Sequence, residues 1–243
     1  MARIFKLMNR TRVKICGVCR AEDAAAAARL GADAIGMVFH PPSPRNISPE
    51  AAEKIMAALP AFVTPVGLFV DAPLDDIGQL CRRLRLANVQ LHGHEAPETV
   101  ARVIEQTGAF VFKALRVDRG SLGAELDLWR DAIARLGLDR LRGLVLETAG
   151  GPAPGGTGRV NDWETARSFL DEGAFDGLPP IIAAGGLTPG NVAGVIRTLR
   201  PFAVDVSSGV EVARGQKSAA KMEAFLLAVR EADLASPIIA QAP

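Results

Sequence analysis

The chain of 243 residues has no tyrosine, only three cysteines and no excess of charge of either sign. Three cysteines are too few, and of the wrong parity, for the disulfide framework of a small secreted fold, so we expect a reducing cytoplasm. A formal net charge of +1 gives no general attraction to nucleic acid or to a membrane surface, and we expect neither partner. Anionic ligands must therefore be bound by local groups.

Long apolar runs are also missing. No run approaches the ~18 residues needed to span a bilayer, and the start, MARIFKLMNRTR, lacks the apolar core of a signal peptide. With 49% hydrophobic and 23% charged residues, the composition is that of a globular protein, and the length is close to the ~250 residues of one TIM barrel. We expect a single α/β domain over residues 1–243, with a barrel core at about 12–232, a short N-terminal leader and a loose C-terminal tail.

Short apolar runs alternate with helix-patterned segments along the chain, which is typical of a parallel sheet covered by helices. The predicted strands are Val13 to Cys16, Ala34 to Phe39, Val63 to Val70, Asn88 to Leu91, Phe110 to Leu115, Gly143 to Leu146, Pro180 to Ala184 and Phe202 to Val206. The predicted helices are Glu22 to Leu30, Ser48 to Leu59, Leu74 to Leu84, Pro97 to Thr107, Leu122 to Leu136, Asp162 to Leu170, Pro189 to Leu199 and Ser218 to Ala232.

Eight such units predict a (β/α)8 TIM barrel. The strand runs are continuously apolar, as expected when both faces of a parallel strand are buried. An open doubly wound sheet is the alternative, but no G-x-G-x-x-G follows an early strand. Two helix starts are firm, because Ser48 and Thr188 each put a capping hydroxyl before a proline.

Glycine and serine turns follow the last two predicted strands. Gly185 and Gly186 follow the seventh strand, and Ser207, Ser208 and Gly209 follow the eighth. Barrels commonly bind phosphate at these two places with backbone N–H groups. The pattern predicts a phosphate monoester ligand; the alternative is a pair of tight turns without a ligand.

Cys16 ends the first strand and precedes a glycine, so it is a candidate base or nucleophile, although burial as a small apolar side chain is the common fate of a cysteine. Lys14, two residues earlier, points to the same face of the strand. Cys16 and Cys19 also form a C-x-x-C pair, which favours a thioredoxin-like redox site only weakly, because that fold needs about half of this chain and leaves the two turns unexplained.

Four further candidates lie at the ends of predicted strands or just after them. Arg45 stands in a proline-rich loop after the second strand and suits a planar carboxylate, unless it is a solvated loop arginine. Asp205 and Glu147 follow buried apolar runs, where a carboxylate is costly unless it faces a polar site. His92 follows the fourth strand; we expect it in the substrate-binding region, with a hydrogen-bonded rim histidine as the alternative.

Eight short motifs follow one another along the chain: KICG, SPRNIS, VGLFVDAP, VQLHGHE, KALRV, GGTGRVNDW, AAGGLTPGNV and RPFAVDVSSGVE. In this order they resemble the motif series of the phosphoribosylanthranilate isomerase family of tryptophan biosynthesis. The resemblance runs from about Val13 to Glu211. It implies an aldose-ketose type isomerase that converts N-(5′-phosphoribosyl)anthranilate to the 1-deoxyribulose 5-phosphate product by an Amadori rearrangement, with no cofactor and no metal.

The same resemblance implies roles for single residues. Cys16 matches the general base, Arg45 matches the arginine that holds the anthranilate carboxylate, and Asp205 lies near the ribose. The phosphate falls on the two turns already described. The segment Gly155 to Gly158 matches a mobile loop that orders over the substrate and excludes water. The resemblance leaves open whether the protein is a monomer or a homodimer.

The general acid departs from the family pattern, which has an aspartate where this chain has Glu147. The extra methylene moves the proton by roughly 1 Å unless the backbone compensates, and a misplacement of that order can cost about 10²-fold in rate. This departure leaves two alternatives open: a weakly active or inactive relative that binds phosphorylated ligands, and an isomerase of a related phosphoribosyl-amine. His94, where many relatives carry an acidic residue, is a peripheral change.

Overall fold

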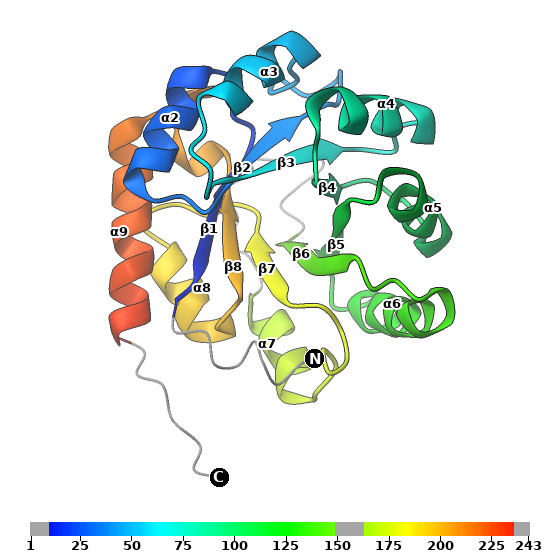
Figure 1. Cartoon of the computed structure of the whole chain (residues 1–243). Coiled ribbons are helices and arrows are strands. Elements are labelled where there is room, and N and C mark those ends of the chain that lie inside the picture. The colour runs from blue at the N-terminus through cyan, green and yellow to red at the C-terminus, as the bar shows by residue number, and fades with distance from the viewer. Residues whose placement is uncertain (1–9, 149–162, 236–243) are drawn as a thin grey trace.

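The computed structural model describes residues 10–148 and 163–235. Eight parallel strands close into a barrel in chain order, with β1 paired to both β2 and β8, and helices surround it (Figure 1). The strands are β1 Arg12–Ile15, β2 Ala34–Val38, β3 Thr64–Phe69, β4 Asn88–Leu91, β5 Phe110–Val117, β6 Leu141–Thr148, β7 Ile181–Ala184 and β8 Ala203–Val206. The predicted TIM barrel is confirmed, and the open sheet is excluded.

A helix follows each strand. These helices are α2 Ala21–Leu30, α3 Pro49–Ala57, α4 Leu74–Leu84, α5 Pro97–Thr107, α6 Leu122–Leu136, α7 Trp163–Asp171, α8 Val192–Leu199 and α9 Ala219–Ala235. The bounds of α4, α5 and α6 match the prediction. The predicted capping role of Ser48 is also confirmed, because its side chain accepts a hydrogen bond from the Ala51 N–H and Pro49 follows it as the first helical residue.

Apart from shifts of one to three residues in some bounds, two local features differ from the prediction. The sequence predicts that α8 begins at Pro189, but it begins at Val192 because the Asn191 side chain binds backward to the Thr188 N–H and the Gly186 carbonyl, holding these residues in a turn. A 3-10 turn, η1 Ser208–Val210, and a hairpin of β9 Glu211–Ala213 and β10 Gln216–Lys217 follow β8. Runs of two or three residues give no periodic signal, so sequence patterning misses them.

Three predicted features lie outside the described residues: the N-terminal leader, the C-terminal tail and the loop Gly155 to Gly158. Within the described ranges, no helix is long and apolar enough to cross a membrane.

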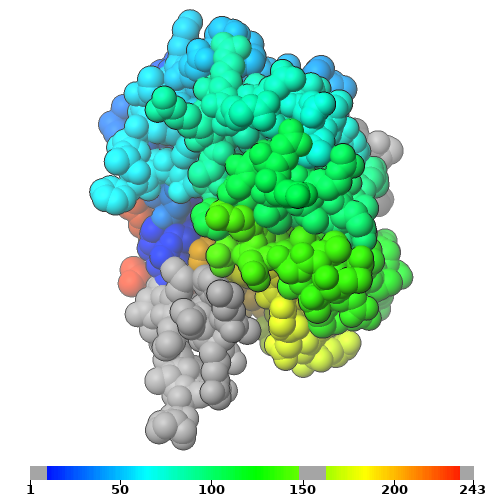
Figure 2. Space-filling model, turned by 45° about the vertical axis from the view of Figure 1, so that its right-hand side comes forward, coloured from blue at the N-terminus to red at the C-terminus, as the bar shows by residue number. Residues whose placement is uncertain are grey.

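Apolar packing divides into a shell and a barrel interior. The large cluster fills the space between strands and helices. Figure 2 shows one outer face of the molecule, over which the colours pass from cyan to green and yellow along the chain. Inside the barrel a smaller cluster joins Val145, Ile182, Ala184 and Ala203. Because alternate residues of a strand face the interior, this cluster forms the floor beneath the carboxyl ends of β6, β7 and β8.

Candidate active site

Polar side chains line the inside of the barrel at the carboxyl ends of four strands. On β6 and β8 the apolar residues Val145 and Ala203 belong to the interior cluster, so Glu147 and Asp205, two positions further along, share their inward face. The same alternation applies on β1 and β4. Six polar residues that face inward on these four strands are Lys14, Cys16, Gln90, His92, Glu147 and Asp205.

A buried ion pair joins β1 to β8. Lys14 Nζ lies 2.6 Å from Asp205 Oδ2, and both side chains are less than one-tenth exposed. Burial opposes the charged form of Lys14, but Asp205 and Cys16 outweigh it, so the pKa of Lys14 is raised. Asp205 Oδ1 is the one buried side-chain polar atom in the described part of the chain that lacks a hydrogen-bond partner. It is therefore an acceptor available to a donor outside this pair.

Cys16 lies beside this pair, and its N–H donates to the Val206 carbonyl at 2.8 Å. Burial raises the pKa of the Cys16 thiol, while Lys14 acts in the opposite direction by favouring the thiolate. A Cβ on Gly36 would lie 2.7 Å from Cys16 Sγ and 3.1 Å from Lys14 Nζ. Only glycine at that position of β2 leaves room for the thiol and the ammonium together.

Cys19 does not share this environment. Its Sγ lies 3.7 Å from the Gly17 carbonyl oxygen and 3.6 Å from the Arg45 carbonyl oxygen. The closed barrel also excludes the thioredoxin-like fold that a redox C-x-x-C pair implies. The two thiols therefore belong to different polar groups.

On the other side of the mouth, His92 and Glu147 form a hydrogen-bonded pair. His92 Nε2 lies 2.9 Å from Glu147 Oε2, and His92 Nδ1 lies 2.8 Å from Gln90 Nε2. Because a Gln amide nitrogen only donates, this arrangement makes His92 Nδ1 an acceptor and Nε2–H the donor to Glu147. The side chains of His92 and Glu147 are 21% and 28% exposed, so the pair meets solvent.

The charge of Glu147 is set by competing effects. Burial raises the pKa of Glu147, but the hydrogen bond and charge of His92 and the charge of Arg116 outweigh it, and the net shift is downward. Glu147, which stands where an aspartate was expected, is therefore a carboxylate at neutral pH and accepts a hydrogen bond from His92.

The two glycine turns lie against each other. Gly185 and Gly186 have φ of +87° and +62°, a conformation that glycine adopts without strain. A Cβ on Gly209 would lie 1.9 Å from the Leu187 carbonyl oxygen. The turn after β8 is thus pressed onto the turn after β7, and only glycine permits that contact.

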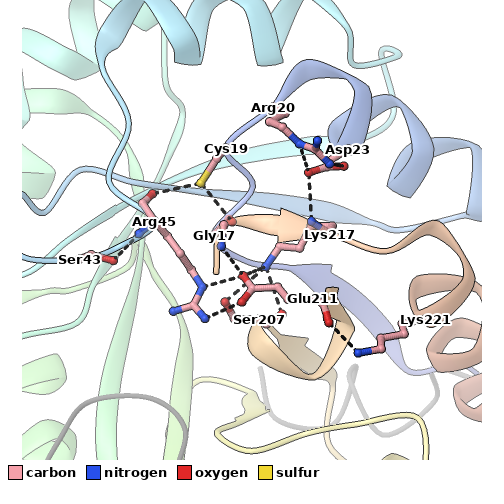
Figure 3. Close-up of polar contacts among 11 residues, drawn as sticks. Gly17, Cys19, Arg20, Asp23, Ser43, Arg45, Ser207, Glu211, Lys217 and Lys221 are labelled. Carbon is pink, nitrogen blue, oxygen red and sulfur yellow. Dashed lines mark hydrogen bonds and ion pairs between the residues drawn. The ribbon is translucent and has the colours of Figure 1, made fainter. Parts of the chain in front are cut away.

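Arg45 lies over the same end of the barrel and is held by an acidic residue. Its Nε and Nη2 donate to Glu211 Oε1 and Oε2 at 2.7 and 2.8 Å (Figure 3). Lys217 Nζ donates to the same Glu211 Oε1 at 2.9 Å and to the Ser207 carbonyl at 3.1 Å. The hydrogen bonds that Arg45 donates to Glu211, and the charge of Glu211, raise the pKa of Arg45 against the effect of burial.

Sequence reasoning gave Glu211 and Lys217 no role in the site. Both lie on the unpredicted hairpin of β9 and β10, so no strand pattern assigns them to the barrel mouth. The one available signal is the charge of Glu211 directly after the Ser207 to Gly209 turn. Arg116, whose charge acts on Glu147, was missed as well because β5 extends two residues beyond the predicted Leu115.

A groove of about 650 Å³ lies between the β2–α3 and β3–α4 segments, lined by Phe39, Ile47, Phe69 and Leu80 among others. None of the six inward-facing polar residues lines it. The convergence of buried charges and closely packed glycine turns, rather than this groove, marks the candidate site.

A closed (β/α)8 barrel with titratable groups gathered at the carboxyl ends of its strands is the architecture of a TIM-barrel enzyme. The sequence profile of the family described as N-(5′-phosphoribosyl)anthranilate (PRA) isomerase matches residues 13–228. The chain therefore belongs to the phosphoribosylanthranilate isomerase family, and the resemblance seen in the motif series is confirmed.

Individual relatives agree. The chain is 42% identical over 230 residues to an N-(5′-phosphoribosyl)anthranilate isomerase from Ralstonia nicotianae, covering 94% of this chain and 96% of that relative. It is similar to the crystal structure of phosphoribosyl anthranilate isomerase from Thermotoga maritima, with 35% identity and a TM-score of 0.79 over 91% of this chain and 99% of that one. A structure of the isomerase in complex with reduced 1-(o-carboxyphenylamino)-1-deoxyribulose 5-phosphate matches with 35% identity and a TM-score of 0.75, over the same shares. A further Thermotoga maritima structure is described as monomers of a dimeric isomerase.

Proposed function

We propose that this chain catalyses the Amadori rearrangement of N-(5′-phosphoribosyl)anthranilate to 1-(2-carboxyphenylamino)-1-deoxy-D-ribulose 5-phosphate in tryptophan biosynthesis. Family membership supports the reaction class. The observation that carries the proposal is that one barrel mouth holds a thiol beside a buried ammonium, Cys16 with Lys14, together with a carboxyl group, Glu147. An aldose-to-ketose rearrangement needs one base and one acid in this relation to a single substrate.

Binding of the substrate uses the two ends of the site. The phosphate binds to backbone N–H groups of two turns, one at Gly185 and Gly186 and the other at Ser207, Ser208 and Gly209. These two turns lie against each other. The anthranilate carboxylate falls on Arg45. Its Nε and Nη2 already bind Glu211, so the carboxylate takes the remaining edge, formed by Nη1 and the second Nη2 hydrogen.

Proton transfer follows from the same placement. Glu147 protonates the ribose ring oxygen, which opens the ring to a Schiff base. Cys16 as thiolate then removes the proton from C2′, and the enolamine tautomerises to the ketone. Lys14 favours the thiolate that this step needs. The unpartnered Asp205 Oδ1 accepts a hydrogen bond from a ribose hydroxyl, and His92 contacts the substrate through its ring beside Glu147.

A weakly active relative that binds phosphorylated ligands is the second candidate. The observation in its favour is the Glu147 carboxylate held by His92, since a general acid must carry a proton when the ring opens. The retained Cys16, Arg45 and paired turns favour the working isomerase.

Several wider properties stay predictions. We infer a cytoplasmic enzyme, because Cys16, Cys19 and Cys81 are free thiols and fit a reducing compartment. We further expect one domain over the whole chain, a monomer or a homodimer, no cofactor, no metal and no nucleic-acid partner.

The test is to generate phosphoribosylanthranilate in solution, add the purified protein and follow the loss of anthranilate-type fluorescence. Rapid loss that Cys16→Ser lowers by about 10²- to 10⁴-fold supports the isomerase and its base. Cys81→Ser is the matched control, because Cys81 is equally buried but lies in α4 away from the mouth. No loss with the parent and recovery in Glu147→Asp would identify the weakly active relative, and no loss in either, with turnover of another phosphoribosyl-amine, would identify the related isomerase.

A further inference from the structure

The guanidinium of Arg45 has two edges that can each hold a carboxylate, and the protein occupies one of them. Glu211 accepts from Nε and Nη2 at 2.7 and 2.8 Å. The other edge, with Nη1, has no partner among the described residues, and 17% of the Arg45 side chain is exposed. The direction in which that open edge faces depends on Glu211.

Glu211 itself is immobilised from several sides. Its side chain is 6% exposed, and Oε1 accepts from Lys217 Nζ at 2.9 Å and from the Gly215 N–H at 3.3 Å. Its carbonyl oxygen accepts from Lys221 Nζ at 2.7 Å. Figure 3 shows Lys217 from β10 and Lys221 from α9 converging on Glu211. A carboxylate fixed in this way dictates the rotamer of the arginine that it binds.

The stem of Arg45 is fixed as well. A Cβ on Gly17 would lie 2.3 Å from Arg45 Cδ, so the stem passes directly over the turn that follows β1. Gly17 has φ of +68°, and the Arg45 N–H donates to Ser43 Oγ at 3.1 Å. The aliphatic part of the Arg45 side chain is held at the turn after β1, and its guanidinium is held at Glu211. The open edge of the guanidinium can therefore face in one direction only.

The charges of this cluster, defined as Arg45, Glu211 and Lys217, leave one positive charge unbalanced. Two cations share one carboxylate, and the Lys217 side chain has no exposed area. An anion at the open edge of Arg45 supplies the missing charge. Without the Glu211 carboxylate, Arg45 and Lys217 repel each other, and the guanidinium is free to turn into solvent.

We propose that Glu211 is a positioning residue that sets the orientation of Arg45 and thereby makes the site selective for a substrate with a carboxylate on its aromatic amine. This inference rests on the proposed function. Glu211 does not touch the substrate; it acts through Arg45. Lys217 supports this arrangement, because it keeps Glu211 charged and also donates a hydrogen bond to the Ser207 carbonyl beside the phosphate turn.

The experiment compares two substrates, phosphoribosylanthranilate and the same compound without the carboxylate, N-(5-phosphoribosyl)aniline. We expect Glu211→Gln to lower kcat/KM for the first by about 10- to 100-fold, the usual worth of hydrogen bonds to a charged group, mainly through KM. For the aniline compound we expect a change below about twofold. In an Arg45→Ala background, Glu211→Gln has no further effect, because its target is gone.

Glu95→Gln is the matched control. Glu95 is also a buried carboxylate bound by a lysine, Lys113 at 2.9 Å, but it lies after β4 and does not contact Arg45. Its loss lowers stability without changing the ratio between the two substrates. If Glu211→Gln does not fold, Glu211→Asp keeps the charge beside Lys217 and withdraws the carboxylate from Arg45, and the same selective loss is expected.

Equal losses on both substrates, or a further loss in the Arg45→Ala background, overturn the proposal. A second readout separates it from the proposed function: the Kd of reduced 1-(o-carboxyphenylamino)-1-deoxyribulose 5-phosphate and of its analogue without the carboxylate. If the parent turns over neither substrate, the proposed function fails, while a selective rise in Kd for the carboxylated analogue in Glu211→Gln still supports the positioning role. An unchanged Kd overturns it.

Discussion

The two sides of the barrel mouth hold their charges differently. On the β1 and β8 side, Lys14 and Asp205 form an ion pair with less than one-tenth of either side chain exposed, and Glu211 is fixed between two cations. On the β4 and β6 side, His92 and Glu147 form a single pair with 21% and 28% exposure. The first side has its charges set by buried partners, whereas the second is in contact with solvent.

The difference in exposure indicates a different task for each side of the mouth. Buried ion pairs keep their charge across a wide pH range, because neutralising one partner leaves the other charged and unpaired in the interior. They suit fixed tasks, such as favouring a thiolate or holding an arginine. A partly exposed pair can gain and lose a proton, as a general acid must in each turnover. The comparison therefore predicts mainly a loss of stability when the Lys14–Asp205 pair is broken, and mainly a loss of turnover when Glu147 is changed.

The largest effect is expected from Lys14→Met. The change leaves Asp205 buried without its cation, and the free energy of unfolding should fall by about 3–5 kcal/mol in urea denaturation. The double variant Lys14→Met with Asp205→Asn removes the charge as well and should regain much of this loss. A single variant as stable as the parent would break the comparison.

Glu147→Gln should show the reverse pattern. The amide still accepts from His92, so we expect the free energy of unfolding to change by less than about 1 kcal/mol. The amide carries no acid proton, so kcat should fall by about 10²- to 10⁴-fold in the fluorescence assay. Unchanged turnover would remove Glu147 from the role of general acid.

Gly209→Ala tests the contact between the two turns. Its Cβ would lie 1.9 Å from the Leu187 carbonyl oxygen, so the turns must separate, at a cost of about 1–3 kcal/mol in unfolding free energy and a higher KM for the phosphorylated substrate. Gly190→Ala, in the neighbouring loop after β7, is the control, since its Cβ would meet nothing nearer than 3.8 Å. Equal KM values in the two variants would argue against a phosphate site at these turns.

The smallest effect concerns pH. Turnover requires Cys16 unprotonated and Glu147 protonated at the same time, and the pKa of Cys16 is raised while that of Glu147 is lowered. The active fraction is then constant between the two pKa values, falling below the pKa of Glu147 and above that of Cys16.

His92→Asn removes the contact that lowers the pKa of Glu147. The pKa of Glu147 should rise, and the acidic limb of kcat/KM should move to higher pH while the alkaline limb, set by Cys16, stays in place. The measurement is a pH profile of kcat/KM for both proteins. An acidic limb that does not move would show that another group controls it.

Most of the fold could be predicted from the sequence. Continuous apolar runs and amphipathic segments of 9 to 15 residues gave the eight units, and the bounds of α4, α5 and α6 needed no correction. The misplaced start of α8 depends on a side-chain contact of Asn191 across the turn, and the hairpin of β9 and β10 is too short for periodicity to reveal.

The sequence by itself determined which strand-end residues come to the barrel mouth, because the carboxyl ends of parallel strands must meet at one edge of the barrel. Only the tertiary structure decided how they pair. Lys14 and Asp205 are 191 positions apart, and Arg45 and Glu211 are 166 apart. Ion pairs of this kind depend on burial and on a few ångströms of distance, which closure of the barrel fixes and local sequence patterns do not encode.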